Sequence, residues 1–200
     1  MCKRICMMLV LFSLLVVFSS CKCKPAVVGS LAVTLHPQET SMWCWAASGQ
    51  MVMDYLGNNV AQCTQANNRF NRNDCCDIDL CPNPDNGHAC ATGGWPEFDK
   101  YGFTFKKTTN APLSWDDLRK QISNEKYCKK KPFAFTWAWD GGGGHMMVAK
   151  GYLTLNNTNY VVMLDPWAPC VGDERIITYD DYDDGAGYSH WNDYYDVTPI

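Results

Sequence analysis

Cysteine is the residue that most constrains this chain, because twelve cysteines occur among its 200 residues. That number is too high for an ordinary cytosolic protein of this size, since disulfides persist in oxidising compartments. An apolar share of 46% is enough to build a core and excludes a disordered chain. The length favours a single domain, with at most a short tail.

The N-terminus has the pattern of a secretory signal. Lys3 and Arg4 precede an apolar run over residues 7–18. This run is too short for a membrane-spanning helix, which needs about 20 residues. We therefore expect a signal peptide over residues 1–20.

The residues that follow the apolar run indicate how the exported chain is held. The sequence Phe-Ser-Ser-Cys that ends at Cys21 resembles a bacterial lipobox, with Phe in place of the usual Leu. We expect a lipid anchor on Cys21, a tether over residues 21–32 and the folded domain over residues 33–200. The alternative is an ordinary signal, cleaved nearby, and plain secretion.

Net charge narrows the class of partner. The whole chain carries a formal charge of −4, and loss of Lys3 and Arg4 with the signal makes the mature chain more acidic. A nucleic-acid binder needs a basic face, so no nucleic-acid partner is expected. We also expect a monomer.

Hydrophobic periodicity indicates an α+β fold. Apolar residues cover much of the circumference of a helix predicted over residues 43–56, which should be deeply buried. Further helices are expected over residues 60–72 and 114–122, where Ser114 and Asp117 have capping-box spacing. Strands are expected over residues 31–35, 132–139, 145–152, 160–164, 175–179 and 194–197. Helices followed by antiparallel strands indicate helices packed against one sheet.

Four residues combine into a candidate catalytic site. Cys44 begins the buried helix, where the helix dipole favours a thiolate. His145 follows four glycines, whose bare backbone lets a substrate approach closely. Asp165 ends an apolar strand, where a buried carboxylate needs a partner such as an imidazolium. Gln38 is six residues before Cys44, and its amide can donate to a developing oxyanion.

These residues resemble the site of the papain-like cysteine peptidases. Gln38 precedes the Cys-Trp pair at Cys44 by that family's spacing, and His145 opens a strand that ends in Gly-Tyr. Asp165, in Asp-Pro-Trp, stands where the family has Asn in Asn-Ser-Trp. The combination is most similar to compact bacterial members, which include effector proteases secreted by plant pathogens.

The resemblance implies both a fold and a reaction. The fold is α+β, with the buried N-terminal helix packed against a C-terminal antiparallel sheet or half-barrel. The reaction is hydrolysis of a peptide or protein substrate through a thioester on Cys44, with His145 as base and Asp165 as its orienting group. Gln38 and the Cys44 N–H would form the oxyanion hole, and Trp167 would shield the His–Asp pair. No cofactor or metal is expected.

Two other functions remain open at this point. Transglutaminase-like and bacteriocin-leader peptidase domains also use Cys, His and Asp in this order, and would transfer or process the acyl group differently. Gln38 and the Cys-Trp-Ala-Ala sequence at Cys44 favour a papain-like hydrolase. A non-enzymatic exported binding protein on the same scaffold is the second alternative.

The other cysteines are interpreted as disulfide partners. With Cys21 lipidated, eight remain: Cys23, Cys63, Cys75, Cys76, Cys81, Cys90, Cys128 and Cys170. The adjacent Cys75 and Cys76 are not expected to pair with each other. A zinc cluster that adds His88 to four of these cysteines lacks two Cys-x-x-Cys pairs, so disulfides are favoured.

Two further motifs receive structural interpretations. The acidic residues 180–184 have their glycine one place early for an EF-hand loop and are interpreted as a solvated turn. Trp137, Trp139, Trp167 and Trp191 could line a substrate groove, but all except Trp167 are interpreted as core residues, because aromatic side chains at strand spacing usually pack inside.

Overall fold

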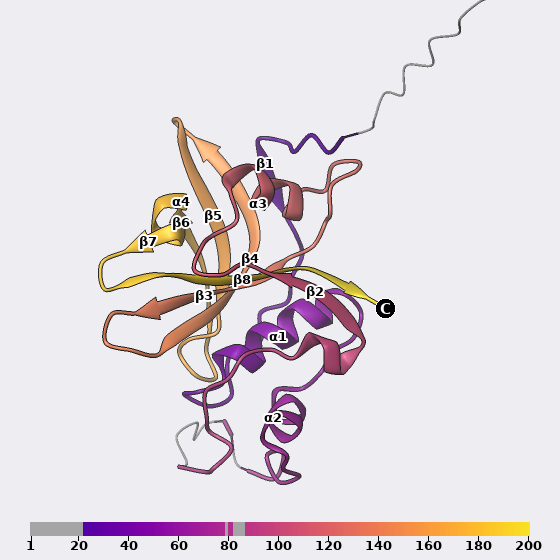
Figure 1. Cartoon of the computed structure of the whole chain (residues 1–200), viewed down its shortest axis with the longest axis vertical. Coiled ribbons are helices and arrows are strands. Elements are labelled where there is room, and N and C mark those ends of the chain that lie inside the picture. Colours follow the sequence, from indigo (N-terminus) through magenta and orange to yellow (C-terminus); the bar gives the residue numbers. More distant parts are fainter. Residues whose placement is uncertain (1–21, 79, 82–86) are drawn as a thin grey trace, which may run out of the picture.

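The computed structural model describes residues 22–78, 80–81 and 87–200 (Figure 1). The expected signal peptide, residues 1–20, and the expected lipidation site, Cys21, lie outside the described residues. The helices are α1 (Cys44–Tyr55), α2 (Gln62–Phe70), α3 (Trp115–Ile122) and α4 (Tyr179–Asp183), with a short 3-10 helix at Phe98–Tyr101. The strands are β1 (Val28–Ser30), β2 (Phe103–Lys107), β3 (Phe133–Trp139), β4 (Gly144–Leu155), β5 (Thr158–Asp165), β6 (Asp173–Thr178), β7 (Asp184–Gly185) and β8 (Tyr188–Pro199).

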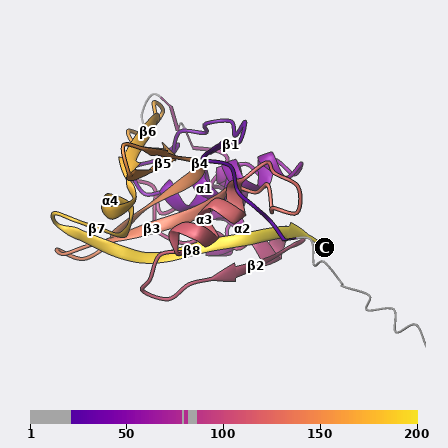
Figure 2. The same cartoon turned by 90° about the horizontal axis from the view of Figure 1, so that it is seen from above.

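All eight strands belong to one antiparallel sheet, and the α+β prediction is confirmed. Six strands run in the order β2-β8-β3-β4-β5-β6, while β1 pairs with β4 and β7 with β8. The long strand β8 lies between β2 and β3 in the sheet and runs beside β3 in the view from above (Figure 2). Helix α1 packs against β4 and β3, and α2 packs against α1 on the side away from the sheet (Figure 1).

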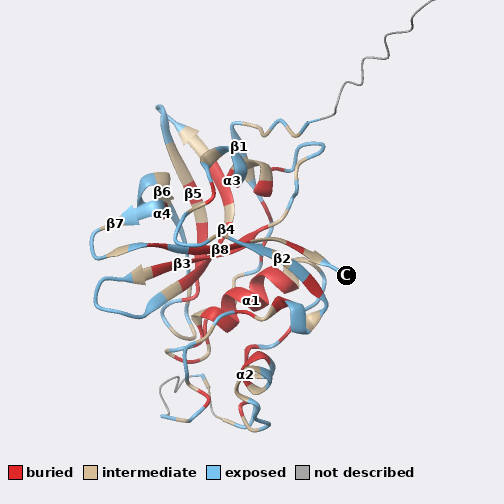
Figure 3. Ribbon diagram, viewed as in Figure 1, coloured by how far each residue is buried: buried red, intermediate tan, exposed pale blue. Residues whose placement is uncertain are grey.

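Helix α1 is the buried centre of the molecule, as its apolar circumference predicts. Every residue from Trp45 to Met53 is buried, and Figure 3 shows the helix almost wholly in the buried class. A helix that is apolar on most sides must be covered on most sides. Here the sheet covers one side and α2 covers another. The start of this helix is therefore a rigid place for a side chain.

The capping signal at α3 is also found in the structure. Ser114 is the N-cap of α3, and its hydroxyl oxygen accepts a hydrogen bond of 3.2 Å from the Asp117 N–H. The Ser114 hydroxyl in turn donates to the Asp117 carboxylate at 2.7 Å. The first of these bonds satisfies one of the unpaired backbone N–H groups at the helix start, and the second holds the Ser114 hydroxyl in place.

Several elements differ from the sequence-based expectation. The first strand is β1, residues 28–30, and residues 31–35 are not a strand. The last strand begins at Tyr188, six residues earlier than expected. Elements β2, β7 and the 3-10 helix were not expected. The acidic run expected to be a turn forms α4, because Thr178 caps it by accepting from the Asp181 N–H at 3.0 Å.

The expected tether is attached to the domain over the part that the structure describes. Strand β1 pairs with β4, from Val28 opposite Leu153 to Ser30 opposite Gly151. Cys23 is bonded to Cys128 in the loop after α3. The chain therefore joins the fold close to where the described residues begin.

Four disulfides use the eight cysteines assigned to pairing. The bonds are Cys23–Cys128, Cys63–Cys76, Cys75–Cys90 and Cys81–Cys170. Adjacent Cys75 and Cys76 go to different partners. The sulfur atoms of the alternative zinc cluster are thus consumed in disulfides and are not available as thiolate ligands.

Candidate active site

Cys44 is the first residue of α1 and, among the described cysteines, the one with a free thiol. Its two neighbours hold it in place. The buried indoles of Trp43 and Trp45 donate to the backbone oxygens of Cys90 at 2.7 Å and Thr92 at 3.2 Å. The thiol is therefore fixed between the buried helix and the loop that follows Cys90, and it lies in a cleft.

His145 and Asp165 meet across the neighbouring strands β4 and β5. The His145 Nε2 lies 2.6 Å from the Asp165 Oδ1, and the two side chains are only 13% and 7% exposed. The Cys44 side chain interacts electrostatically with His145, and the two residues line the same cleft. Because the carboxylate engages Nε2, Nδ1 is the ring nitrogen that remains for the thiol. The three side chains form a continuous line from nucleophile to carboxylate.

Electrostatics at this site favour a charged pair. Burial lowers the pKa of His145, but hydrogen bonds and charge interactions with Asp165 and Cys44 outweigh it and raise the pKa to about 9. Burial raises the pKa of Asp165, but its bonds to His145, the Trp167 N–H and Arg175 outweigh this and leave it below the usual value. At neutral pH the site therefore holds an imidazolium beside a carboxylate.

Gln38, the candidate oxyanion-hole residue, is attached to the loop that follows Asp165. It is fully buried, and it is not among the residues that line the cleft. The Nε2 donates to the Thr40 backbone oxygen at 2.7 Å, while the Oε1 has no hydrogen-bond partner among the described residues. Backbone bonds to Pro166 at 3.0 Å and Cys170 at 2.8 Å tie Gln38 to the loop after Asp165.

The cleft has a volume of about 740 Å³ and exposes Cys44 and His145. Strands β2, β3, β4, β6 and β8 form one side, and the loops around Met42 and Gly93 form the other. Much of the lining is aromatic. The ring of Trp139 is stacked with His145, with an interplanar angle of 11° and centroids 6.4 Å apart. A free thiol and an imidazole that line a cleft, with a buried carboxylate bonded to the imidazole, are the parts that acyl transfer to a thiol requires.

Comparison with known protein families identifies the chain's relatives. A family model described as the Peptidase_C39 like family matches residues 30–198. The chain belongs to this family. The match covers the whole sheet apart from most of β1, together with all four helices. No individual curated protein matches the sequence.

Family membership makes this chain a papain-like cysteine peptidase, as the sequence motifs indicated. In this peptidase the cleft is lined by all four tryptophans considered from the sequence. Trp137 is buried, so the core interpretation holds for it, but it is wrong for Trp139 and Trp191, which are 40% and 45% exposed. These two lie where β3 and β8 reach the cleft, so one face of each is left without a protein neighbour. Trp167 is 51% exposed, and its backbone N–H, rather than its ring, is bonded to Asp165 at 3.0 Å.

Sequence reasoning missed one residue of the candidate site. The Arg175 Nη1 lies 2.9 Å from the Asp165 Oδ2, on the oxygen that His145 does not use. Arg175 comes from β6, where it pairs with Met163 of β5. No motif marks it, and the strand pairing alone brings it to Asp165.

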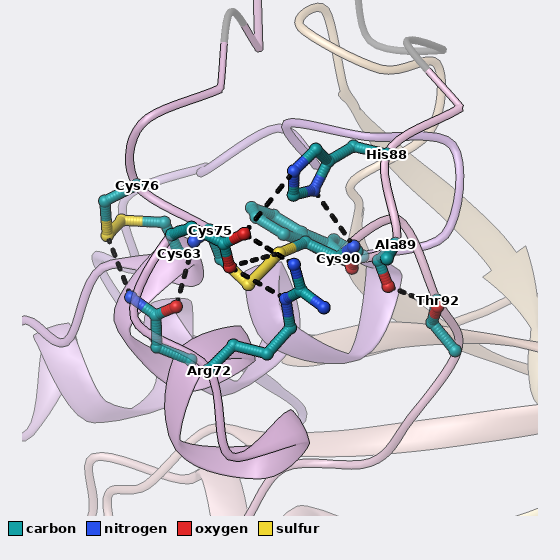
Figure 4. The surroundings of a disulfide bond; sticks show 11 residues. Cys63, Arg72, Cys75, Cys76, His88, Ala89, Cys90 and Thr92 are labelled. Atoms are coloured by element: carbon teal, nitrogen blue, oxygen red, sulfur yellow. Dashed lines mark hydrogen bonds and ion pairs between the residues drawn. A yellow bond between two sulfur atoms is a disulfide. The ribbon is translucent and has the colours of Figure 1, made fainter.

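The far wall of the cleft comes from the cysteine-rich loop. Gly93, Gly94 and Trp95 line the cleft, directly after the segment that the two buried indoles hold. Figure 4 shows the Cys75–Cys90 disulfide that anchors this segment, with the Cys90 N–H donating to the His88 Nδ1 at 3.2 Å.

Within the described part of the chain, no helix combines the length and hydropathy needed to cross a bilayer.

Proposed function

We propose that this chain is an exported peptidase that hydrolyses peptide bonds with Cys44, His145 and Asp165 as its catalytic triad. The observation that carries the proposal is the position of His145, which lies 2.6 Å from Asp165 and shares the cleft with the free Cys44 thiol. A thiol, a base and an orienting carboxylate in this order form the recurrent machinery of thiol peptidases.

The proposed reaction starts from a protonated His145 beside the Cys44 thiolate. The Cys44 thiolate attacks the carbonyl carbon of the scissile bond, and the carbonyl π electrons move to the oxygen. His145 gives its proton to the leaving amine as the C–N bond breaks, which leaves a thioester on Cys44. Water then attacks the thioester carbon while His145 takes one proton from the water. The C–S bond breaks, which releases the acid product and restores the Cys44 thiolate. Asp165 keeps the ring oriented and stabilises the imidazolium.

The oxyanion is proposed to be held by the Cys44 N–H and the Gln38 side chain. Among the described residues no side chain caps the N-terminus of α1, and Cys44, the first residue of this helix, lines the cleft. The Gln38 amide has a second N–H besides the one donated to Thr40. Removing one such donor typically costs about 100- to 1000-fold in kcat. Trp167 is proposed to limit water access to the His145–Asp165 pair.

Export is part of the proposal. Four disulfides fit an oxidising compartment, and the pattern of residues 1–20 fits a secretory signal. Cys21 is proposed to carry a lipid that holds a monomeric enzyme at a membrane surface, facing the periplasm or the cell exterior.

The test is cleavage of a peptide library by the wild-type chain and by Cys44→Ala. We expect cleavage only by the wild type, and labelling of Cys44 by an electrophilic thiol probe that is lost in His145→Ala. Adding a primary amine separates hydrolysis from acyl transfer, because a transferase would join the amine to the product. Equal cleavage by Cys44→Ala would overturn the assignment.

A further inference from the structure

The charge of the cleft is opposite to that of the chain. Although the chain is acidic overall, with a formal charge of −4, no Asp or Glu is among the described residues that line the cleft. Two permanent cations, Lys107 and Arg175, do line it. Such a local reversal of charge concentrates ligands of the opposite sign, here anionic ones.

The two cations lie on opposite sides of the proposed catalytic pair. Lys107 ends β2 and Arg175 lies in β6, and these strands are at the two ends of the six-strand order. Strand β4, which carries His145, lies between them. A ligand that spans the cleft past His145 therefore approaches one cation on each side.

Both cations retain capacity for a ligand. The Arg175 side chain is 47% exposed, and its bond to Asp165 uses one guanidinium nitrogen, so other N–H groups face the open side. The Lys107 Nζ lies 5.1 Å from the centre of the Tyr194 ring, which holds it by a cation–π contact. Neither contact saturates the hydrogen-bond donors of these groups.

Tryptophans occupy the space between and around the cations. Trp95, Trp139, Trp167 and Trp191 all line the cleft, and each has 40–54% of its surface exposed. A cluster of half-exposed indoles is costly in water and marks a surface that a ligand covers. Flat apolar side chains, aromatic or large aliphatic, fit such faces.

We infer that the cleft takes an acidic peptide segment whose aromatic or large aliphatic side chains flank the bond to be cut, with carboxylates that reach Lys107 on one side and Arg175 on the other. The inference deepens the proposed peptidase function and rests on it for the cut itself. A neutral oligosaccharide would also stack on the indoles, but it would leave both cations without a partner, so the peptide is favoured.

The test measures binding separately from catalysis. The full chain with Cys44→Ala, its disulfides intact, is titrated with three blocked eight-residue peptides while tryptophan fluorescence is followed. One peptide has Phe and Leu at the centre and Glu toward both ends, the second has Lys for Glu, and the third has Ser for Phe and Leu. The neutral sugar chitotetraose is the fourth ligand.

We expect the first peptide to bind about tenfold more tightly than either of the others at low salt, because complementary charge and apolar contact both contribute. The preference over the Lys peptide should shrink at 0.5 M salt, since exposed charges are screened. Lys107→Glu in the same background should reduce that preference about tenfold. The matched change Lys100→Glu, at an exposed position outside the cleft, should leave it unaltered.

Equal or tighter binding of the Lys peptide, or binding of chitotetraose alone, would overturn the inference. Parallel cleavage assays with the wild-type chain separate it from the proposed function. Cleavage that depends on Cys44 but ignores acidic residues would sink the inference and leave the peptidase intact. Selective binding without any cleavage would support the acidic-peptide site and count against the peptidase function alone.

Discussion

The carboxylate of Asp165 explains why this chain has Asp where the papain-like pattern has Asn. Its Oδ1 accepts from the His145 Nε2 and the Trp167 N–H, and its Oδ2 accepts from Arg175. An Asn amide would turn its NH₂ group toward one of these donors, which would leave that donor unsatisfied. Burial raises the pKa of Asp165, but His145 outweighs this, and the bond from Arg175 adds a smaller contribution that keeps the carboxylate ionised. Asp165 and Arg175 are thus a matched pair.

Removing Arg175 should change both the rate and the pH profile. Without it the Asp165 charge is less neutralised, so the imidazolium of His145 gains stability and its pKa rises. For Arg175→Ala we expect kcat/KM to fall about fivefold, since a partly exposed ion pair contributes about 1 kcal/mol. The alkaline limb of the profile, expected near pH 9 from the pKa of His145, should move to higher pH. The measurement uses a peptide without acidic residues, so that substrate charge has no part in it.

Arg175→Lys is the matched variant for this prediction. It keeps the charge but loses the planar guanidinium, so the alkaline limb should stay in place while kcat/KM falls less. If Arg175→Ala had the wild-type profile and rate, the pairing of Arg175 with Asp165 would have no catalytic role.

At the scale of elements, the cleft wall depends on the cysteine-rich loop. The Cys75–Cys90 disulfide fixes the segment whose backbone oxygens receive the two indoles beside Cys44. The next residues, Gly93 and Gly94, line the cleft. A disulfide bond outside the candidate site thus positions part of the cleft wall.

Replacing both Cys75 and Cys90 by Ser should loosen this wall. A loop with a sequence separation of 15 is stabilised by about 3 kcal/mol when closed by a disulfide. We expect that loss in the free energy of unfolding, together with an about fivefold higher KM, because the wall is correctly placed for a smaller fraction of the time. Urea unfolding and steady-state kinetics measure the two effects.

The Cys63–Cys76 bond provides the control, since its separation of 13 is nearly the same and neither residue lines the cleft. Replacing Cys63 and Cys76 by Ser should cost similar stability and leave KM unchanged. Equal KM values in the two double variants would contradict a role for the wall.

The turn before His145 gives a second prediction at this scale. A Cβ at Gly144 would collide with the carbonyl oxygen of Trp137 on β3, so a side chain there forces β3 and β4 apart. We expect Gly144→Ala to cost about 1–3 kcal/mol of stability, as overpacking does, and to lower kcat because His145 is the next residue. Gly141→Ala is the control, since its Cβ meets nothing within 4 Å. A Gly144→Ala enzyme with wild-type kcat and melting temperature would refute the steric argument.

The elements that the sequence predicted best have a pattern that depends on their own residues alone. Helix α1 is apolar over most of its circumference, and β3 alternates large and small side chains. Most of β8 was not predicted, because its buried residues His190, Asn192 and Asp193 are polar. Asp193 has a partner far along the chain, since its Oδ2 accepts a 2.6 Å bond from the Leu113 N–H. Polar burial of this kind has no hydrophobic period to detect.

The residues of the candidate site also differ in whether the sequence alone could identify them. Cys44, His145 and Asp165 were singled out because each has a local signal: a helix start, a glycine run or a strand end. Arg175 was not, since only the register of β5 and β6 brings it near Asp165. The exposed tryptophans were misjudged because period-two spacing gives the shared face of a strand but not what covers that face.

At the scale of the whole molecule, two disulfides join parts that are far apart in sequence. Cys23–Cys128 spans 105 residues and Cys81–Cys170 spans 89. The first joins the segment before β1 to the loop after α3. The second joins the cysteine-rich loop to the loop after Asp165. Together they hold the helical part and the sheet part in one arrangement around the cleft, which lies between them.

The charged site should make the stability of the whole protein depend on pH. The folded-state pKa of His145 is about 9, above the usual 6.5. Below pH 6.5 both the folded and unfolded forms bind this proton, so the stabilisation is fully present. Between pH 6.5 and 9 only the folded state keeps the proton, and stability falls as pH rises. His190 acts in the same direction, because burial lowers its pKa but the bond to Asp193 outweighs this and raises it.

We therefore expect the free energy of unfolding to fall between pH 6.5 and 9, with at most about 3 kcal/mol of the loss due to His145. Urea unfolding with the disulfides intact, at several pH values, measures the slope. His145→Gln should remove most of it and leave the smaller part due to His190. Cys44→Ala should give an intermediate slope, since the thiol is one cause of the raised pKa of His145. A wild-type slope in His145→Gln would show that the imidazolium is not held by the folded protein, and the charge state assigned to the active site would then be wrong.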